Sequence, residues 1–299
     1  MKTTLLILML VVCPLVFGQT TAIPDSVFEQ HIIDLGLDDV LDGQVLTSNI
    51  DTLTALTLGN YGSILDLAGI EDFIALEELS VYSYFLETID LTSNIALKEL
   101  NCWGYHLNNV ELSNNTALTR LSISAFNLTS LDISTNLALQ KLDIGNNNLT
   151  SLDVSHNLAL QILDCSDNQL TSLDVSNNIY LTSLSCNNNY YASGNMLTSL
   201  DLSNNIALQY VDCSRNPLNN LDVDMNTNLV DLNCSNNQLT SLDVSNNLTL
   251  QSLDCSGNAL NNLDVILNTS LMNLSCSNNQ LNSLDLTQNI ALTNLECSF

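Results

Sequence analysis

The sequence predicts a β-rich solenoid: an arc of about twelve coils with a face of parallel strands and a short helical cap at the N-terminal end. Two observations carry this prediction. A leucine pattern recurs every 21 residues over most of the chain, and inside each copy apolar residues alternate with polar ones, as in a half-buried strand. Since 45% of the 299 residues are apolar, stacked coils can bury a continuous core.

The first 18 residues are predicted to be a secretory signal peptide. Lys2 supplies the positive start, and an unbroken apolar run follows over residues 5–12. Val16 and Gly18 occupy the −3 and −1 positions of a cleavage site before Gln19. The apolar run is too short to cross a bilayer, so we expect an exported protein without membrane insertion.

Residues 19–52 are predicted to form the cap, with one short helix. Ser26 and Glu29 have the spacing of a capping box, which predicts the start of this helix, and Gly36 predicts its end. Asp42 and Gly43 predict a turn. Three apolar residues share one face of the helix and are expected to cover the end of the first coil: Phe28, Ile32 and Leu35.

The solenoid is predicted over residues 53–299. Each unit follows the pattern L-x-x-L-x-C-x-x-N-x-L-x-x-L-D-V-x-x-N-x-x. The units begin at Leu53, Leu76, Leu97, Leu118, Leu139, Leu160, Leu181, Leu208, Leu229, Leu250, Leu271 and Leu292. The first unit has two extra residues, and the unit at Leu181 has six, close to 190–195. The last unit is incomplete and stops at Phe299.

Eight cysteines occupy one slot of the unit. They are Cys102, Cys165, Cys186, Cys213, Cys234, Cys255, Cys276 and Cys297, and the other units place Leu58, Val81, Ile123 and Ile144 in the same slot. A slot that alternates between cysteine and aliphatic residues is typical of a core, because a free thiol packs as a small apolar group. We therefore expect buried, inert thiols; disulfides between neighbours and metal binding are the open alternatives.

Asparagines form two further columns, which are expected to hold the bends through hydrogen bonds to the backbone. The first column comprises Asn147, Asn168, Asn189, Asn216, Asn237, Asn258 and Asn279, and the second recurs from Asn94 to Asn289. Aromatic residues replace the first column in the early units: Tyr61, Tyr84, Tyr105 and Phe126. We expect them to form an internal spine rather than an exposed binding stripe.

The chain is strongly acidic, with 32 Asp and Glu residues against five Lys and Arg and a net charge of −27. This charge argues against nucleic acid or anionic membranes as partners. Acidic residues form a column that is expected to point outward and to accept hydrogen bonds from nearby backbone and hydroxyl groups: Asp66, Asp90, Glu111, Asp132, Asp153, Asp174, Asp201, Asp222, Asp243, Asp264 and Asp285. Weak calcium binding is its alternative role; no other metal or cofactor is expected.

The candidate binding residues lie at positions where the sequence departs from the repeat pattern. Four residues precede the second leucine of successive units: Glu78, Glu99, Arg120 and Lys141. Tyr82 and Trp103, the single tryptophan, follow the cysteine slot on adjacent rungs. Exposed aromatics beside arginine have the composition of a binding hot spot, and they also suit stacking on a sugar. Tyr190 and Tyr191, in the longest insertion, are a second candidate site.

No nucleophile motif, phosphate-binding loop or metal-spaced His/Cys cluster occurs in the sequence, so an enzyme is not expected. The half unit L-x-x-L-x-C-x-x-N-x-L matches the signature of leucine-rich repeats. The full unit, LTSLDVSNN-x-ALxxLDCSNNQ, and the leader IPDSVFEQHIIDLGLDDVLDGQVL resemble the internalin-like repeats of secreted Bacteroidota proteins. This resemblance spans about 250 residues.

The resemblance implies a monomeric module, secreted or on a bacterial cell surface, that binds or adheres to a protein through its concave face. One alternative is a glycan-binding module that uses Tyr82, Trp103 and Tyr84. Another is a passive surface spacer that binds cations. Many proteins of this family end in a C-terminal sorting domain, which this sequence does not contain, so it is left open whether the chain is a fragment of a longer protein.

Overall fold

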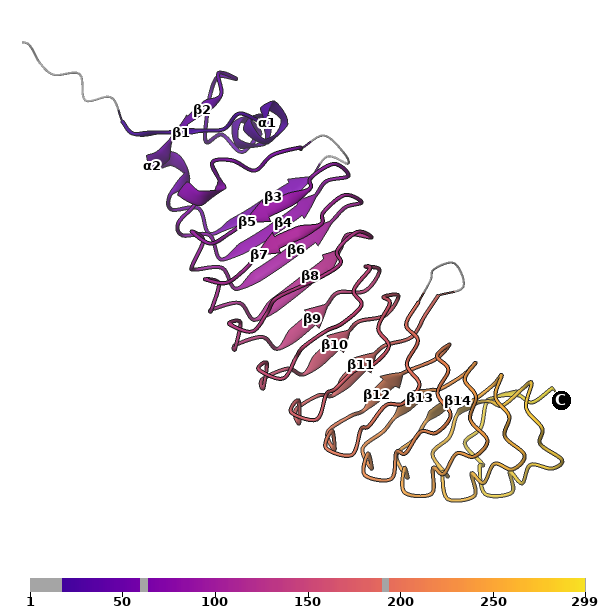
Figure 1. Cartoon of the computed structure of the whole chain (residues 1–299). Helices are drawn as coiled ribbons and strands as arrows, with labels where there is room; N and C mark the ends of the chain where they lie inside the picture. Colours follow the sequence, from indigo (N-terminus) through magenta and orange to yellow (C-terminus); the bar gives the residue numbers. More distant parts are fainter. Residues whose placement is uncertain (1–17, 60–63, 190–193, 299) are drawn as a thin grey trace, which may run out of the picture.

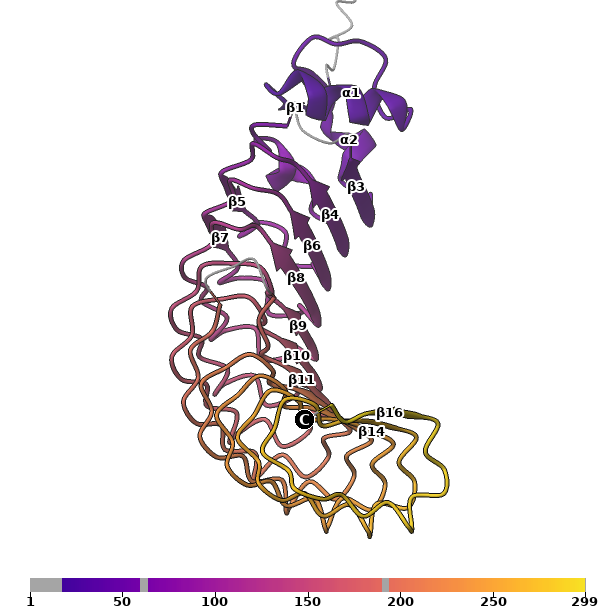
Figure 2. The ribbon, with the colours of Figure 1, turned by 90° about the vertical axis from the view of Figure 1, so that its right-hand side faces the viewer.

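The computed structural model describes residues 18–59, 64–189 and 194–298. The predicted signal peptide therefore lies almost wholly outside the described residues, as do Tyr61, Tyr190 and Tyr191. The coils stack side by side into a curved rod with the cap at one end (Figure 1). Figure 2 shows the strands along the inner side of the curve and the loops along the outer side.

Twelve parallel strands form one continuous sheet, with one strand from each coil, as predicted. In sheet order they are β3 (Ala55–Gly59), β4 (Glu78–Tyr82), β6 (Glu99–Trp103), β8 (Arg120–Ser124), β9 (Lys141–Asp143), β10 (Ile162–Asp164), β11 (Ser183–Ser185), β12 (Tyr210–Asp212), β13 (Asp231–Asn233), β14 (Ser252–Asp254), β15 (Asn273–Ser275) and β16 (Asn294–Glu296). The early coils add a small parallel sheet of β5 (Thr88–Asp90) and β7 (Asn109–Glu111), and a 3₁₀ turn, η1 (Ile70–Asp72).

The register of the sheet confirms the repeat boundaries. Leu56 faces Leu79 across β3 and β4, which accommodates the two extra residues of the first unit. Leu184 faces Val211 across β11 and β12, so the register of the sheet is kept across the unit with six extra residues. The leucine and cysteine columns face inward and form one continuous core. Seven of the eight column cysteines are buried free thiols, and Cys297 on the last rung is half-buried.

The two asparagine columns bind the backbone of neighbouring coils. In the second column, Nδ2 of Asn247 donates to the carbonyl oxygens of Val223 (3.0 Å) and Asn226 (2.8 Å), and the side chain is fully buried. In the first column, Nδ2 of Asn237 donates to carbonyls of its own and the preceding coil, while its Oδ1 accepts the backbone N–H of Leu218. Each coil is thereby bonded to the one before it.

One predicted member of the first column is wrong. Asn195, not Asn189, occupies the ladder position, since its Nδ2 donates to the backbone oxygens of Cys165 and Cys186. Asn189 instead bonds the side chain of Asp167. The extra residues begin at the bend itself, before the ladder position, so counting forward from the strand selects the wrong asparagine.

The cap consists of β1 (Thr20–Ala22), α1 (Ser26–Asp34), β2 (Gln44–Leu46) and α2 (Thr47–Ile50). The predicted capping box is wrong: Asp25 is the N-cap of α1, and its carboxylate accepts the backbone N–H groups of residues 27 and 28. Glu29 is buried and turns away from the helix end. Its Oε1 accepts the N–H groups of Asp42 (2.8 Å) and Gly43 (2.6 Å), and so holds the predicted turn.

The C-terminal end of α1 follows the prediction. Gly36 has a positive φ of 74°, and the N–H groups of Gly36 and Leu37 bond the carbonyls of Ile33 and Ile32. Leu35, however, is 54% exposed, so the predicted apolar face is formed by residues 28 and 32 alone. Among them, Phe28 stacks on Phe73 of the first coil, with ring centroids 6.0 Å apart, and thereby seals the end of the solenoid.

Candidate functional site

The predicted internal spine of aromatic side chains is wrong where the structure describes it. Tyr84 is half-buried, and Tyr105 and Phe126 are 45% and 40% exposed. The cause is strand length, because β4, β6 and β8 are five residues long whereas β9 to β16 are three. The alternation of these longer strands continues into the residue that directly follows each strand, an inward position filled by the buried small residues Ser83, Gly104 and Ala125. The next residue must then point outward.

The outward aromatic residues pack on one another from coil to coil. The ring centroid of Tyr105 lies 5.2 Å from that of Tyr84 and 5.1 Å from that of Phe126, and both pairs are stacked. Trp103 meets Tyr84 and Tyr105 edge to face, at 5.4 and 5.5 Å. We call these four residues the aromatic cluster. Beside it, Phe85 stacks on a ring of the next coil, His106, at 6.0 Å.

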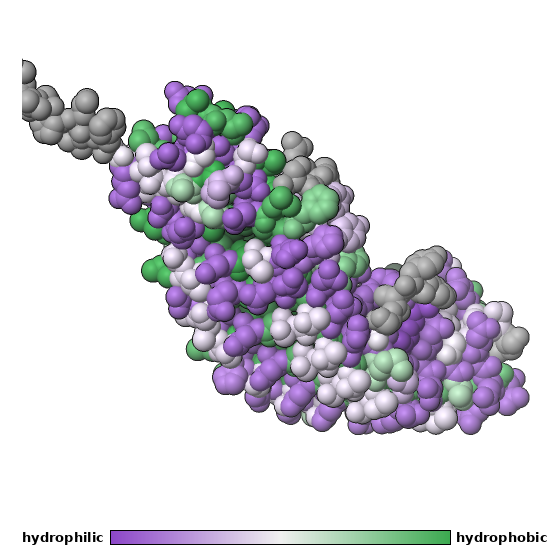
Figure 3. All heavy atoms as spheres, turned by 45° about the horizontal axis from the view of Figure 1, so that its top comes forward, coloured by the Kyte–Doolittle hydropathy of each residue, from purple (hydrophilic) through white to green (hydrophobic). Residues whose placement is uncertain are grey.

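A glycine permits the close packing of coils beneath this cluster. A Cβ at Gly104 would lie 2.0 Å from the carbonyl oxygen of Ser83 in the preceding coil. No side chain fits in that space, so this coil needs glycine at position 104. Figure 3 shows a mostly hydrophilic surface on which hydrophobic residues gather over the cap and the first coils.

The structure brings the predicted candidates on the strands together. Tyr82 pairs with Trp103 at the C-terminal ends of β4 and β6, and Tyr82 is 40% exposed. At the opposite ends of the strands, four residues form one row across the inner face: Glu78, Glu99, Arg120 and Lys141. The candidates thus occupy both ends of neighbouring strands on one face.

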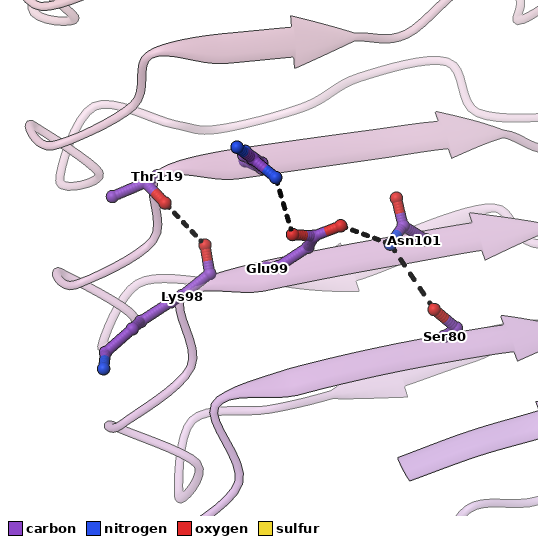
Figure 4. A network of polar contacts seen from close by, with 6 residues as sticks. Ser80, Lys98, Glu99, Asn101 and Thr119 are labelled. Atoms are coloured by element: carbon purple, nitrogen blue, oxygen red, sulfur yellow. Dashed lines mark hydrogen bonds and ion pairs between the residues drawn. The ribbon is translucent and has the colours of Figure 1, made fainter. Parts of the chain in front are cut away.

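Ion pairs and hydrogen bonds form in the middle of this row and next to it. Nη1 of Arg120 lies 3.3 Å from Oε2 of Glu99, and Nζ of Lys98 lies 2.8 Å from Oε1 of Glu77. The other carboxylate oxygen of Glu99 accepts a bond from Nδ2 of Asn101 at 3.1 Å. Figure 4 shows this line of contacts crossing the strands as far as Ser80.

A hollow of about 420 Å³ lies beside the row on the inner face. Its lining is largely polar and includes Glu99, Arg120, Gln140, Lys141 and Gln161, with Ile162 at one edge. Two of the chain's five Lys and Arg residues, Arg120 and Lys141, line this hollow. It therefore differs in charge from the rest of an acidic molecule.

The outer acidic column has the predicted hydrogen bonds. Each carboxylate accepts the backbone N–H two residues later, as Asp243 does from Ser245 at 2.9 Å. Bonds of this kind to the backbone and side chain of the following Ser or Thr hold the pKa of Asp90, Asp132, Asp153, Asp174, Asp201, Asp243 and Asp285 below the usual range. Weak calcium binding by this column stays a prediction.

Sequence reasoning missed all but Asp231 of a second set of acidic residues, which lies on the inner strand face: Asp143, Asp164, Asp212, Asp231, Asp254 and Glu296. Burial, and then the neighbouring carboxylates, raise the pKa of Asp143 and of Asp231. The signal was available, since most of these residues stand between the leucine and the cysteine of a unit, where a strand side chain must face away from the core.

The thiols of the cysteine column are expected to be unreactive, because burial keeps them protonated. Burial raises the pKa of Cys102 and of Cys213 to about 12 and that of Cys276 to about 11, and it raises the pKa of Cys234 as well. A thiol that stays protonated is a poor nucleophile and a poor metal ligand. Within the described residues, no group of three or more His, Cys, Asp or Glu side chains has the geometry of a metal site.

Of the insertion at β11, only the two sides are described. A Cβ at Gly194 would lie 2.1 Å from Oδ1 of Asn188, and Nδ2 of Asn188 bonds the carbonyl oxygens of Asn195 and Arg215. These contacts fix the base of the loop. The tyrosines predicted as a second site remain a prediction. No described helix has the length and apolar character required to cross a membrane.

Comparison with known proteins identifies the type of fold. No family model and no curated protein sequence matches the chain. Its structure is similar to the functional domain of InlJ from Listeria monocytogenes, which includes a cysteine ladder, with 34% identity and a TM-score of 0.73. That alignment covers 94% of this chain and 57% of the InlJ chain, so this chain spans little more than half of that protein's length.

Two further structures share the fold. A leucine-rich-repeat protein of Leptospira interrogans has 24% identity and a TM-score of 0.66, over 83% of this chain and 79% of that one. The internalin InlF of L. monocytogenes has 21% identity and a TM-score of 0.61, over 93% and 96%. The fold is therefore an internalin-type leucine-rich-repeat solenoid. The expected resemblance to internalin-like proteins is confirmed for the fold. The relation to Bacteroidota proteins and the export of the chain stay predictions.

Proposed function

We propose that this chain is an extracellular, non-enzymatic module that binds a protein through the inner strand face of its N-terminal half. The observation that carries the proposal is the aromatic cluster, since its rings pack on one another across three coils while Tyr105 and Phe126 remain exposed on the surface. Large aromatic side chains beside arginine dominate the binding energy of protein interfaces.

The local composition supports the same conclusion. On the later rungs the Trp103 position is filled mainly by serine, so the copied unit offers a small, polar surface there. On the early rungs the same face offers aromatic rings, paired charges and a hollow. A solenoid that only served as a scaffold would not need aromatic and charged residues in place of the repeat's small polar residues on successive rungs.

The packing of the rings favours a protein over a glycan. Sugars bind by laying a pyranose ring on a free aromatic face, but Tyr105 has stacked rings on both sides, Tyr84 and Phe126. The cluster therefore presents largely ring edges, which suit irregular contact with side chains. The fold that this chain shares with InlJ and InlF is consistent with this proposal, because stacked repeats create extended concave surfaces that are suited to binding.

The test is affinity for a captured partner, measured with matched variants. Trp103→Ala and Arg120→Glu should each weaken binding at least tenfold, the range of an interface hot spot. Tyr210→Ala and Ser252→Glu are the controls, because both side chains lie on the same inner face at later rungs. Binding that all four variants leave unchanged would rule out the proposed surface, and binding to a glycan array alone would favour the alternative.

A further inference from the structure

The positive charge on the inner face is concentrated at one place. The chain has five Lys and Arg residues: Lys2, Lys98, Arg120, Lys141 and Arg215. Lys2 lies outside the described residues, and Arg215 lies in the bend after β12 rather than on a strand. Arg120 and Lys141 begin β8 and β9, and both line the hollow.

Within the described residues, Arg120 contacts a single carboxylate. Its guanidinium has five N–H groups, and within the described residues only Nη1 reaches a carboxylate, that of Glu99. The amide of Asn101 donates to the other oxygen of the Glu99 carboxylate. That carboxylate therefore contacts both Asn101 and the guanidinium of Arg120. The Arg120 side chain is 65% exposed. Its outer edge thus faces solvent in a defined orientation.

Lys141 adds a second cation beside it. Lys141 follows Arg120 in the row across the sheet, and it has no ion-pair partner in the part of the chain that the structure describes. The amides of Gln140 and Gln161 line the same hollow and provide further N–H donors. This set of donors is suited to an anionic group with planar oxygen atoms.

We propose that the hollow binds one carboxylate of a partner protein, an Asp or Glu side chain, while an apolar side chain of the same segment packs on the aromatic cluster. This inference rests on the proposed function and names the partner's chemistry. A single carboxylate fits better than a polyanion because acidic residues surround the site, including Glu78 and Asp143, and the chain carries a net charge of −27. Each added negative charge would meet that repulsion.

The strand register sets the spacing of the two partner residues. Arg120 pairs with Glu99 at one end of the strands, and Ser124 pairs with Trp103 at the other. Four residues of extended chain separate the two ends, a distance of about 13 Å. In an extended partner segment, residues four apart point to the same side. The partner motif is therefore an acidic residue and a large apolar residue at positions i and i+4, in either direction.

The experiment is selection of a displayed random peptide library on the full chain, with sequencing of the bound fraction. Parallel selections use Trp103→Ala, the double variant Arg120→Gln/Lys141→Gln, and the control Tyr210→Ala, each confirmed as folded by circular dichroism. Peptides bound by the unchanged protein should be enriched about 3- to 10-fold in Asp or Glu four residues from a large apolar residue. The double variant should lose the acidic preference and keep the apolar one.

The outcomes separate the two proposals. Peptides that depend on Trp103 but show no acidic preference, or prefer Lys and Arg, overturn the carboxylate site and leave the proposed function standing. Enrichment that none of the variants alters, or no enrichment at all, contradicts both. Displacement of the selected peptides by a neutral oligosaccharide at lower concentration than by an acidic competitor peptide also overturns the carboxylate site.

Discussion

Tyr105 stacks on Phe126 across two neighbouring coils, with ring centroids 5.1 Å apart and planes inclined by 21°, on the surface just beyond the C-terminal ends of β6 and β8. Tyr84 continues the stack on the other side of Tyr105. The rings follow one another because each coil places the same position one strand spacing, about 4.8 Å, from the last. A repeat that aligns aromatic residues in this way builds an ordered apolar surface without a pocket.

The stack should contribute measurable stability although it lies on the surface. Tyr105→Ala removes two stacked contacts and one edge contact, so it should lower the free energy of unfolding by about 1–2 kcal/mol. Tyr180→Ala is the matched control, because Tyr180 is 61% exposed and has no ring contact within the described residues. Urea unfolding followed by circular dichroism measures both, and equal costs would contradict the stacking account.

The cysteine slot should accept an aliphatic side chain more readily than a hydroxyl. Val81 and Ile123 share the slot of Cys234, so Cys234→Val keeps an apolar contact, whereas Cys234→Ser buries a hydroxyl among leucines. The serine variant should be less stable than the valine variant by about 1–2 kcal/mol. Thermal and urea unfolding of the pair test this, and a serine variant as stable as the valine variant would count against a dry core.

The same thiols should make the protein sensitive to alkali. Burial raises the folded-state pKa of Cys102 and Cys213 to about 12 and of Cys276 to about 11, above the ordinary 9.0. Their contribution is therefore fully present below pH 9 and is lost as the pH rises toward 11–12. Stability at pH 8 and pH 10 should differ less in Cys213→Val/Cys234→Val/Cys255→Val than in the unchanged protein. Identical pH dependence would refute this cause.

Two aspartates on opposite sides of the coil should respond oppositely to the same change. Backbone and side-chain bonds to Ser245 lower the pKa of Asp243, so its contribution is present above pH 3.8 and is lost as the pH falls through the lowered value. Burial and the charge of Asp212 raise the pKa of Asp231, so its ionisation costs stability as the pH rises through the raised value. At pH 7, Asp243→Asn should destabilise and Asp231→Asn should stabilise.

Both of these differences should shrink on acidification, because the carboxylates become protonated in the folded and unfolded states alike. Urea midpoints of the unchanged protein and of the two variants at pH 7 and pH 2.5 measure the effect. Shifts of the same sign at pH 7 would show that the two acidic columns do not differ in environment.

The buried asparagine ladder should be among the costliest positions to change. Asn247→Ala leaves the carbonyls of Val223 and Asn226 without their donor in a dry interior, at about 1–3 kcal/mol for each unsatisfied group. Asn177→Ala is the control, since Asn177 is exposed and donates one bond of 3.3 Å to Ser155. The control should stay within about 0.5 kcal/mol of the unchanged protein in urea unfolding; a comparable loss in both would contradict the ladder's role.

Most of the fold could be predicted because the 21-residue repeat determines how the coils stack. Once Leu232 and Cys234 face inward, the stacking of identical units decides the sheet, the core and the direction of Asp243. Errors arose where the period is interrupted. The insertion moved the ladder position from Asn189 to Asn195, and the helix of the cap, outside the repeat, took Asp25 as its N-cap.

The candidate site shows the same limit. Column counting placed Tyr105 in the slot of a buried asparagine, but the longer β6 and the small residue Gly104 shift the direction of the side chain to the outside. The sequence could still locate Trp103 and Arg120 as departures from the repeat. It could not show the hollow between their strands, which depends on how neighbouring side chains pack.

The most direct test of the proposed binding surface is the affinity of a captured protein partner for Trp103→Ala compared with Tyr210→Ala. Both changes remove one aromatic ring from the inner face, but only Trp103 belongs to the aromatic cluster. We predict at least a tenfold loss for Trp103→Ala and less than a twofold change for Tyr210→Ala, by titration calorimetry. Equal effects of the two variants, or a larger loss with Tyr210→Ala, would contradict the account.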